Sequence, residues 1–168
     1  MTAQRPGLAP GSTALAVLAL GGCGTSHTPA SAAHATADGV TVTVTLLPPS
    51  HGRRELQATF SPQRPGFHIY SIDLPDHGID GLGIPTRLSV RGSLTAAGRP
   101  TANRTTLLLQ PAGPATDLPV YPDGPVTFTL PVRQTNAHQA DVIVSYGACS
   151  AHTCLIPVSD EVIHLSLN

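Results

Sequence analysis

Hydrophobic and polar residues alternate along residues 40–46, where valine or leucine takes every second position and threonine the positions between. A period of two is typical of a β-strand that buries one face. The Pro48-Pro49 pair that follows would end such a strand, because proline has no backbone N–H to give to the sheet ladder. Residues 40–46 are therefore predicted to form a strand, and their signal is the clearest in the chain.

Similar short runs continue to the end of the chain, separated by turns rich in proline and glycine, at residues 55–60, 67–73, 86–90, 104–110, 126–132, 141–146 and 162–167. No long window after the first 22 residues carries a sustained helical stripe. The 17 prolines and 16 glycines fall mostly between the runs. We predict an all-β sandwich of about eight short strands. The irregular stretches 74–85 and 111–125 are expected to form loops over one end, where they are candidates to shelter a site.

The amino-terminal region has the character of an export signal. Arg5 is followed by an apolar run at 14–20, and Leu20-Gly21-Gly22 leads into Cys23. The run is too short to cross a bilayer, and small residues before a cysteine suit a peptidase that cuts ahead of a residue to be lipidated. The pattern resembles a bacterial lipoprotein signal, and a plain signal peptide cut elsewhere is the alternative. We predict a signal peptide at 1–22 and lipidation of Cys23, which places the protein on the extracytoplasmic face of the bacterial cell membrane.

The residues that follow divide into a tether and one domain. Residues 23–39 are small and polar without apolar periodicity, so we predict a flexible tether in which His27 and His34 are spacers. Residues 40–168 are enough for a single domain. The formal net charge is −1, lysine is absent and the arginines are scattered. Nucleic acid is therefore not expected as a partner.

Two of the three cysteines, Cys149 and Cys154, lie close together within residues 146–157. A bridge between them would close a loop of about six residues and stabilise the fold by only about 2 kcal/mol, so it would be a weak staple. Spacing alone leaves three interpretations open: a structural disulfide, a redox pair or a metal site. Exchange requires a thiolate that a partner can reach, so accessibility and local charge matter more than spacing.

Other polar residues could contribute to such a site. His152 lies between the cysteines and, when protonated, would favour a neighbouring thiolate; a surface histidine is the plainer interpretation. Cys149, His152 and Cys154 would also suit a soft metal, with His138 or His164 as fourth ligand. No second closely spaced ligand pair supports this, so we predict no metal and no cofactor. The aspartates of one loop either accept a proton or solvate a turn: Asp73, Asp76 and Asp80.

Three segments resemble the amino-terminal domain of the DsbD thiol:disulfide interchange proteins, a domain that also occurs as a free-standing disulfide bond corrector-like domain. Gly66-Phe67-His68-Ile69-Tyr70 resembles a Gly-aromatic-x-aliphatic-Tyr strand, and residues 120–128 resemble a Tyr-x-Gly segment leading into a strand. Residues 144–157 resemble the family's Tyr-x-x-Cys…Cys-x-x-Pro signature. The segment before Val120 lacks the family's acidic-aromatic cap sequence. The chain also ends without the membrane and thioredoxin-like domains of full-length members.

The resemblance implies an immunoglobulin-like sandwich that acts as a thiol:disulfide oxidoreductase. Cys149 and Cys154 would relay electrons, with Cys154 forming mixed disulfides and Cys149 resolving them, while Tyr70 and Tyr146 shape access. The donor would be a separate membrane-embedded protein. The clients would be extracytoplasmic thioredoxin-fold proteins, such as disulfide isomerases or cytochrome c biogenesis factors. The alternative is a lipid-anchored binding or scaffold protein whose disulfide is purely structural.

Overall fold

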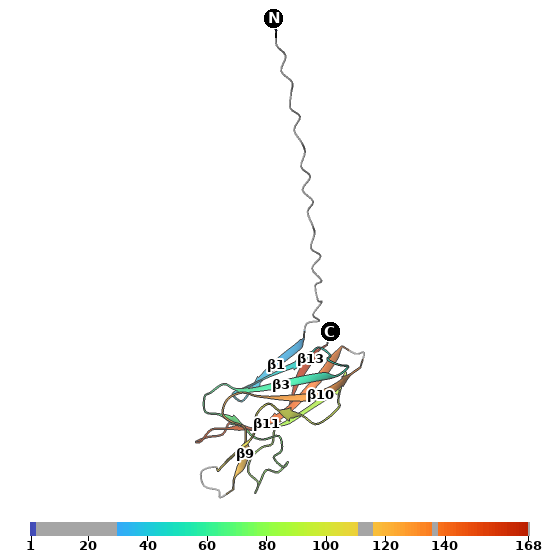
Figure 1. Cartoon of the computed structure of the whole chain (residues 1–168). Coiled ribbons are helices and arrows are strands. Elements are labelled where there is room, and N and C mark those ends of the chain that lie inside the picture. Colours follow the sequence, from blue (N-terminus) through green and yellow to red (C-terminus); the bar gives the residue numbers. More distant parts are fainter. Residues whose placement is uncertain (3–29, 111–115, 136–137, 168) are drawn as a thin grey trace.

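The computed structural model describes residues 1–2, 30–110, 116–135 and 138–167 (Figure 1). These residues contain 13 short strands and no helix. Within the described ranges no helix is therefore long and apolar enough to cross a membrane. The predicted signal peptide and Cys23 fall within residues 3–29, which lie outside the described residues.

The larger sheet runs in the order β1-β2-β3-β10-β6, and β7 also pairs with β10. All of its pairings are antiparallel. Its strands are β1 (Ser31–Ala37), β2 (Val40–Leu46), β3 (Arg54–Pro62), β6 (Leu94–Ala96), β7 (Thr101–Ala102) and β10 (Val126–Gln134).

The second sheet has the order β13-β11-β5, and two strand pairs lie outside both sheets. One pair joins β4 to β12 and the other joins β8 to β9. Figure 1 shows β9 at one end of the molecule and the carboxyl end of the chain at the other. The bounds are β4 (His68–Ile69), β5 (Arg87–Gly92), β8 (Leu107–Leu109), β9 (Leu118–Val120), β11 (Gln139–Tyr146), β12 (Ala148–Cys149) and β13 (Val158–Ser166).

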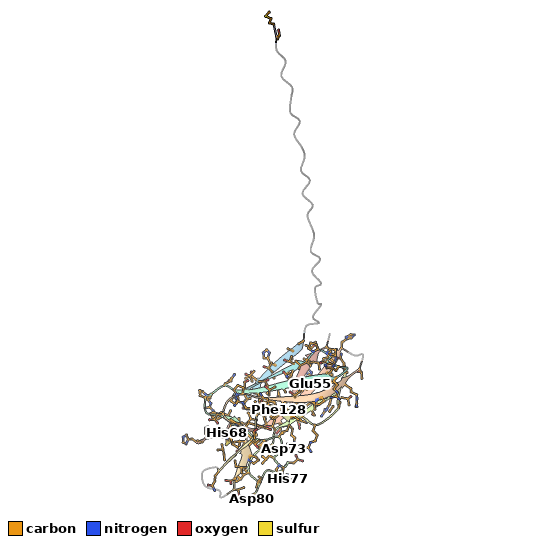
Figure 2. The ribbon with its side chains drawn as sticks, viewed as in Figure 1. Glu55, His68, Asp73, His77, Asp80 and Phe128 are labelled. Atoms are coloured by element: carbon orange, nitrogen blue, oxygen red, sulfur yellow. A yellow bond between two sulfur atoms is a disulfide. The ribbon has the colours of Figure 1, made fainter. Side chains whose placement is uncertain are left out.

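The core lies between the two sheets and is built from the alternating residues of their strands. In β2, the residues at 40, 42, 44 and 46 are at most 2% exposed, as the period of two predicts. Phe128 stacks edge-to-face on Phe60 and on Tyr121, with ring centroids 5.3 and 5.4 Å apart. Figure 2 shows Phe128 inside the sandwich. The predicted all-β sandwich is confirmed, and each of the eight predicted runs overlaps one of the 13 strands.

The predicted tether is wrong over residues 31–37, which form β1 and pair along their whole length with β2. Asp38 and Gly39 join the two strands with φ of 44° and 75°. An Asp-Gly pair with positive φ at both residues is the preferred two-residue hairpin turn. Alanines of β1 pack on the core although they carry too little apolar surface to give a clear sequence period. The Asp38-Gly39 pair is a hairpin signal in the sequence, but the weak apolar pattern of residues 31–37 gave no sign of a strand before it.

Candidate functional site

β11 leads directly into the cysteine segment, where the chain passes from the main core to a second buried cluster. A bulge between Val144 and Tyr146 shifts its register against β13, and β12 then pairs with β4 instead of continuing the sheet. Tyr146 and Ala148 still face the main core. Cys149 belongs to a second, smaller buried cluster that includes Tyr70.

Cys149 and Cys154 form a disulfide across a tight turn, with Cα atoms 4.0 Å apart. We call residues 148–155 the cysteine hairpin. Backbone bonds close it: Ser150 N–H donates to the Thr153 carbonyl at 2.7 Å, and Leu155 N–H donates to the Ala148 carbonyl at 2.9 Å. Ser150 Oγ accepts the backbone N–H of Thr153 at 3.2 Å, which further orders the turn.

The two sulfur-bearing residues differ in exposure. Cys149 is 5% exposed, whereas Cys154 is exposed at the surface. The hydroxyl of Tyr70 lies 3.2 Å from Cys149 Sγ and is placed to donate a hydrogen bond to it. Cys154 is therefore the member of the pair that faces solvent, while Cys149 is buried with a hydrogen-bond donor at its sulfur.

Two glycines allow the ring of Tyr70 to sit against the cysteine hairpin. A Cβ atom at Gly147 would lie 3.0 Å from Tyr70 Cδ2 and 2.9 Å from Ile84 Cβ, and one at Gly83 would lie 3.3 Å from Tyr70 Cε1. Burial raises the pKa of the Tyr70 hydroxyl above its usual value. Tyr70 thus stays protonated around neutral pH and remains a donor. The sequence-based prediction that Tyr70 lies beside the pair fits this position.

The disulfide opens into a groove of about 1280 Å³. Its walls come from three places: β4 with the residues on either side of it, the β8–β9 pair with the residues that follow it, and the cysteine hairpin. Leu107 and Leu109 of β8 are exposed along it. Of the stretch 111–125, residues from Leu118 to Asp123 line the groove, although Leu118–Val120 form β9 and not a loop, and 111–115 lies outside the described residues. Stretch 74–85 supplies Gly83 and Ile84 behind Tyr70.

A buried histidine also lines the groove and was not singled out from the sequence. His68 is 6% exposed, and it stands directly opposite Cys149 in the β4–β12 pair. Its Nδ1 lies 3.3 Å from Asp123 Oδ1. The alternation of strand residues carried a signal, because His68 precedes Tyr70 by two positions and so shares its face. Asp123 has no such local signal, since it is 55 residues away.

Tyr146 does not line the groove, although we expected it to shape access to the pair. It is 2% exposed, its ring lies edge-to-face on Phe60 with centroids 5.4 Å apart, and its hydroxyl donates to the Ala37 carbonyl at 3.0 Å. Burial, with smaller effects of Asp38 and Glu161, raises its pKa to about 12. Alternation along the strand explains the difference, because Tyr146 and Cys149 are an odd number of residues apart and face opposite ways.

The other predicted polar residues are dispersed. His152 is exposed at the tip of the cysteine hairpin and lines the groove. His164, considered as a metal ligand, instead pairs with Asp141 on the second sheet, with Nδ1 2.8 Å from Oδ1. His138 accepts the N–H of Leu167 through its backbone carbonyl. Among the described residues, no group of three or more His, Cys, Asp or Glu side chains is arranged to hold a metal ion.

The three loop aspartates serve local contacts outside the groove. Asp76 pairs with Arg87 at 2.5 Å, which lowers the pKa of its carboxyl below the usual range. Asp80 accepts a hydrogen bond from Thr116 Oγ1 at 2.6 Å, and Asp73 lies 4.0 Å from Arg99. Figure 2 shows Asp73 and Asp80 toward the end of the molecule where β9 lies. Their contacts support the solvated-turn interpretation.

Comparison with known proteins gives a structural likeness only. No protein-family model and no curated protein matches the chain. The N-terminal periplasmic domain of ScsB from Proteus mirabilis superposes with a TM-score of 0.57 and 17% identity. The match covers 80% of this chain and 50% of that one, so the chain spans about half the length of that structure.

A second neighbour superposes less well. The reduced N-terminal domain of DsbD from Neisseria meningitidis gives a TM-score of 0.46 at 13% identity, over 83% of this chain and 85% of that one. The ScsB likeness carries the assignment of fold. The chain thus has the fold of the N-terminal periplasmic domain of ScsB, with a disulfide at the wall of a groove.

Proposed function

We propose that this protein is a thiol:disulfide oxidoreductase that relays electrons through Cys149 and Cys154. One observation carries the proposal: the disulfide joins an exposed cysteine to a buried one, and the buried sulfur has the Tyr70 hydroxyl 3.2 Å away. A purely structural bridge needs neither an open face nor a donor at one sulfur. An exchanging bridge needs the open face because one sulfur is attacked, and the donor favours exchange because the other sulfur must leave as a thiolate.

Reduction of the pair begins with a partner thiolate attacking Cys154 Sγ. A mixed disulfide forms between the partner and Cys154, the Cys149–Cys154 bond breaks, and its electron pair stays on Cys149 Sγ. The Tyr70 hydroxyl donates a hydrogen bond to this thiolate, and charge-assisted hydrogen bonds are the stronger kind. A second thiolate of the partner then attacks the partner's own bridged sulfur and releases Cys154. The partner leaves as a disulfide, and two electrons now reside on the cysteine pair.

Delivery to a client is the same chemistry in reverse. The Cys154 thiolate attacks a client disulfide, and one client sulfur leaves as a thiolate. Cys149 then attacks Cys154 Sγ, re-forms the bridge and releases the reduced client. Cys149 is suited to this resolving step because the cysteine hairpin holds its Cα 4.0 Å from that of Cys154. Leu107 and Leu109 give the groove an apolar wall against which a client can pack.

The setting of this relay is part of the proposal. The ScsB domain with the same fold is periplasmic by its description, which supports an extracytoplasmic location for this chain. The residues around Cys23 support a lipid anchor. We propose a membrane-embedded protein as donor and extracytoplasmic thioredoxin-fold proteins as clients.

A redox titration against a thioredoxin-type protein tests the function. A relay should equilibrate with the partner, whereas structural disulfides have potentials below about −300 mV and resist reduction. We expect the fraction of reduced pair, counted by thiol alkylation and mass, to follow the ratio of reduced to oxidised partner. A bridge that stays intact at an excess of reduced partner would favour the alternative, a sandwich scaffold with an inert disulfide.

A further inference from the structure

His68 is a buried titratable group at the disulfide that the exchange steps above do not use. Directly opposed residues of an antiparallel pair have Cβ atoms about 5 Å apart and point to the same face. His68 and Cys149 are such a pair, and both line the groove. The imidazole is thus a cross-strand neighbour of the sulfur that must leave as a thiolate.

Asp123 orients this imidazole. With Oδ1 3.3 Å from Nδ1, the carboxylate favours the proton on Nδ1 and leaves Nε2 with a free lone pair in the neutral ring. The Tyr70 ring packs perpendicular to the imidazole, with centroids 6.3 Å apart, and limits its rotation. The side chain of His68 is 8% exposed, so an ion pair that it makes is screened less than one in water.

The charged and titratable groups near His68 come from several segments. Arg104 donates to the Asp123 carbonyl at 3.3 Å, and Arg64 lies over the Phe67 ring at 4.5 Å from its centroid. The groups that border the same groove are Tyr70 directly after β4, Tyr121 and Asp123 after β9, and Cys149, His152 and Cys154 of the cysteine hairpin. Asp123 is the one acid among these groove residues, and its carboxylate is the one that bonds the imidazole.

We propose that His68, oriented by Asp123, takes up a proton as the disulfide opens and stabilises the Cys149 thiolate as an imidazolium. This rests on the proposed function. The partner thiolate bonds to Cys154 Sγ, and His68 takes up a proton from solvent, which received the partner's proton when its thiol ionised. The Cys149–Cys154 bond breaks, and its electron pair goes to Cys149 Sγ. The product holds a Cys149 thiolate beside a cationic His68, and no further reactant is needed.

The test measures the ionisation of Cys149 as a single thiol. Replacing Cys23 and Cys154 by alanine in the full-length chain leaves Cys149 as the remaining cysteine of three. Its thiolate is followed by ultraviolet absorbance from acid to mildly alkaline pH, below the range where tyrosines ionise. We expect His68→Gln to raise the midpoint of Cys149 ionisation by about one pH unit, because a nearby opposite charge typically lowers the pKa of an acid by about one to three units. Asp123→Asn should move it in the same direction.

A second histidine–aspartate pair in this chain provides the matched control. In this pair His164 Nδ1 lies 2.8 Å from Asp141 Oδ1. The two residues lie on β13 and β11, away from the groove, and the histidine side chain is 83% exposed. His164→Gln should leave the Cys149 midpoint unchanged. His68→Phe, which keeps a buried aromatic ring, serves as a second variant in case His68→Gln does not fold. An unchanged midpoint in a folded His68 variant would overturn the proposal.

Exchange kinetics separate this inference from the proposed function. With both cysteines present, His68→Gln should slow reduction by a thioredoxin-type protein about tenfold at neutral pH, corresponding to a change of one pH unit in thiolate formation. Undiminished exchange in His68→Gln would overturn the role of His68 and leave the function standing. A midpoint shift in a protein that exchanges with no partner would support the His68–Cys149 pairing and contradict the function.

Discussion

Cys149 and Cys154 share one bond but occupy different surroundings. Cys149 is 5% exposed in a cluster with Tyr70, whereas Cys154 is exposed at the edge of the groove. A partner can therefore approach one sulfur and not the other. The asymmetry fits the roles that the sequence resemblance implied, with Cys154 exchanging and Cys149 resolving, and it makes those roles separable by mutation.

A trapping experiment uses this separation. Cys149→Ala removes the internal thiolate that displaces a bound partner from Cys154, so mixed disulfides should accumulate with extracytoplasmic thioredoxin-fold proteins. Cys154→Ala leaves only the buried sulfur, and trapping should be lower. Both variants lose the same bridge, and with it about 2 kcal/mol of stability, so each is the other's stability control. Adducts are counted on non-reducing gels in a Cys23→Ala background. More adduct with Cys154→Ala would reverse the roles.

The residues of the site were predictable to different degrees, for physical reasons. Cys149, Cys154 and Tyr70 lie in motifs that resemble a known family, so the sequence alone made them candidates. His68 was quoted within that motif but not selected, because nothing local shows that it faces Cys149. Its pairing with Asp123 spans 55 positions and depends on how β9 turns back toward β4. Contacts of this kind arise from the folded arrangement and leave no periodic trace in the chain.

At the scale of strands, β11 connects the site to the amino-terminal hairpin. Its last residue, Tyr146, donates to the carbonyl of Ala37 at the end of β1. After Gly147, Cys149 faces the groove cluster with Tyr70. The strong alternation of β2 and β10 and the apolar run within β11 made these strands predictable. The strands of two or three residues were missed where packing, not pattern, determines them, as for β9 and β12.

Tyr146→Phe tests the tie between β11 and β1. The change should lower the free energy of unfolding by about 1 kcal/mol at neutral pH, the usual net effect of one hydrogen bond. The folded-state pKa of Tyr146 is raised from 10.0 to about 12, so its stabilising contribution is present below pH 10 and is lost as pH rises from 10 to 12. The phenylalanine variant should therefore lose stability less steeply over that window.

Urea unfolding at several pH values provides the measurement for Tyr146→Phe. Burial also raises the pKa of Tyr70 and Tyr121, so some alkaline loss should persist in the variant. Tyr121→Phe is a suitable control because its hydroxyl contacts the Ile72 N–H and not β1. If the variant and the parent lose stability equally between pH 10 and 12, burial does not raise the pKa of Tyr146 as described.

Across the whole molecule, the groove and the start of the folded chain lie at opposite ends. β9, which lines the groove, is at one end in Figure 1, and the first residues of β1 lie near the carboxyl end of the chain at the other. A chain held through residues before β1 would therefore leave the groove free to meet a partner. This arrangement suits a protein that is attached to a surface and exchanges electrons with other proteins.

The last prediction concerns that attachment. If Cys23 is acylated, the mature protein should sediment with membranes, and Cys23→Ala should release it or leave it with an uncut leader. Stable attachment requires more than one acyl chain, because a single chain binds a bilayer only marginally. Membrane fractionation and mass spectrometry of the amino-terminal peptide provide the measurement.

Ser26→Ala, three positions away in the same segment, is the control and should stay in the membrane fraction. Because Cys23 lies outside residues 40–168, purified Cys23→Ala protein should still exchange disulfides with a thioredoxin-type partner at the parent rate. A Cys23→Ala protein that remains in the membrane fraction with a processed amino terminus would contradict lipid anchoring and leave the exchange chemistry of Cys149 and Cys154 untouched.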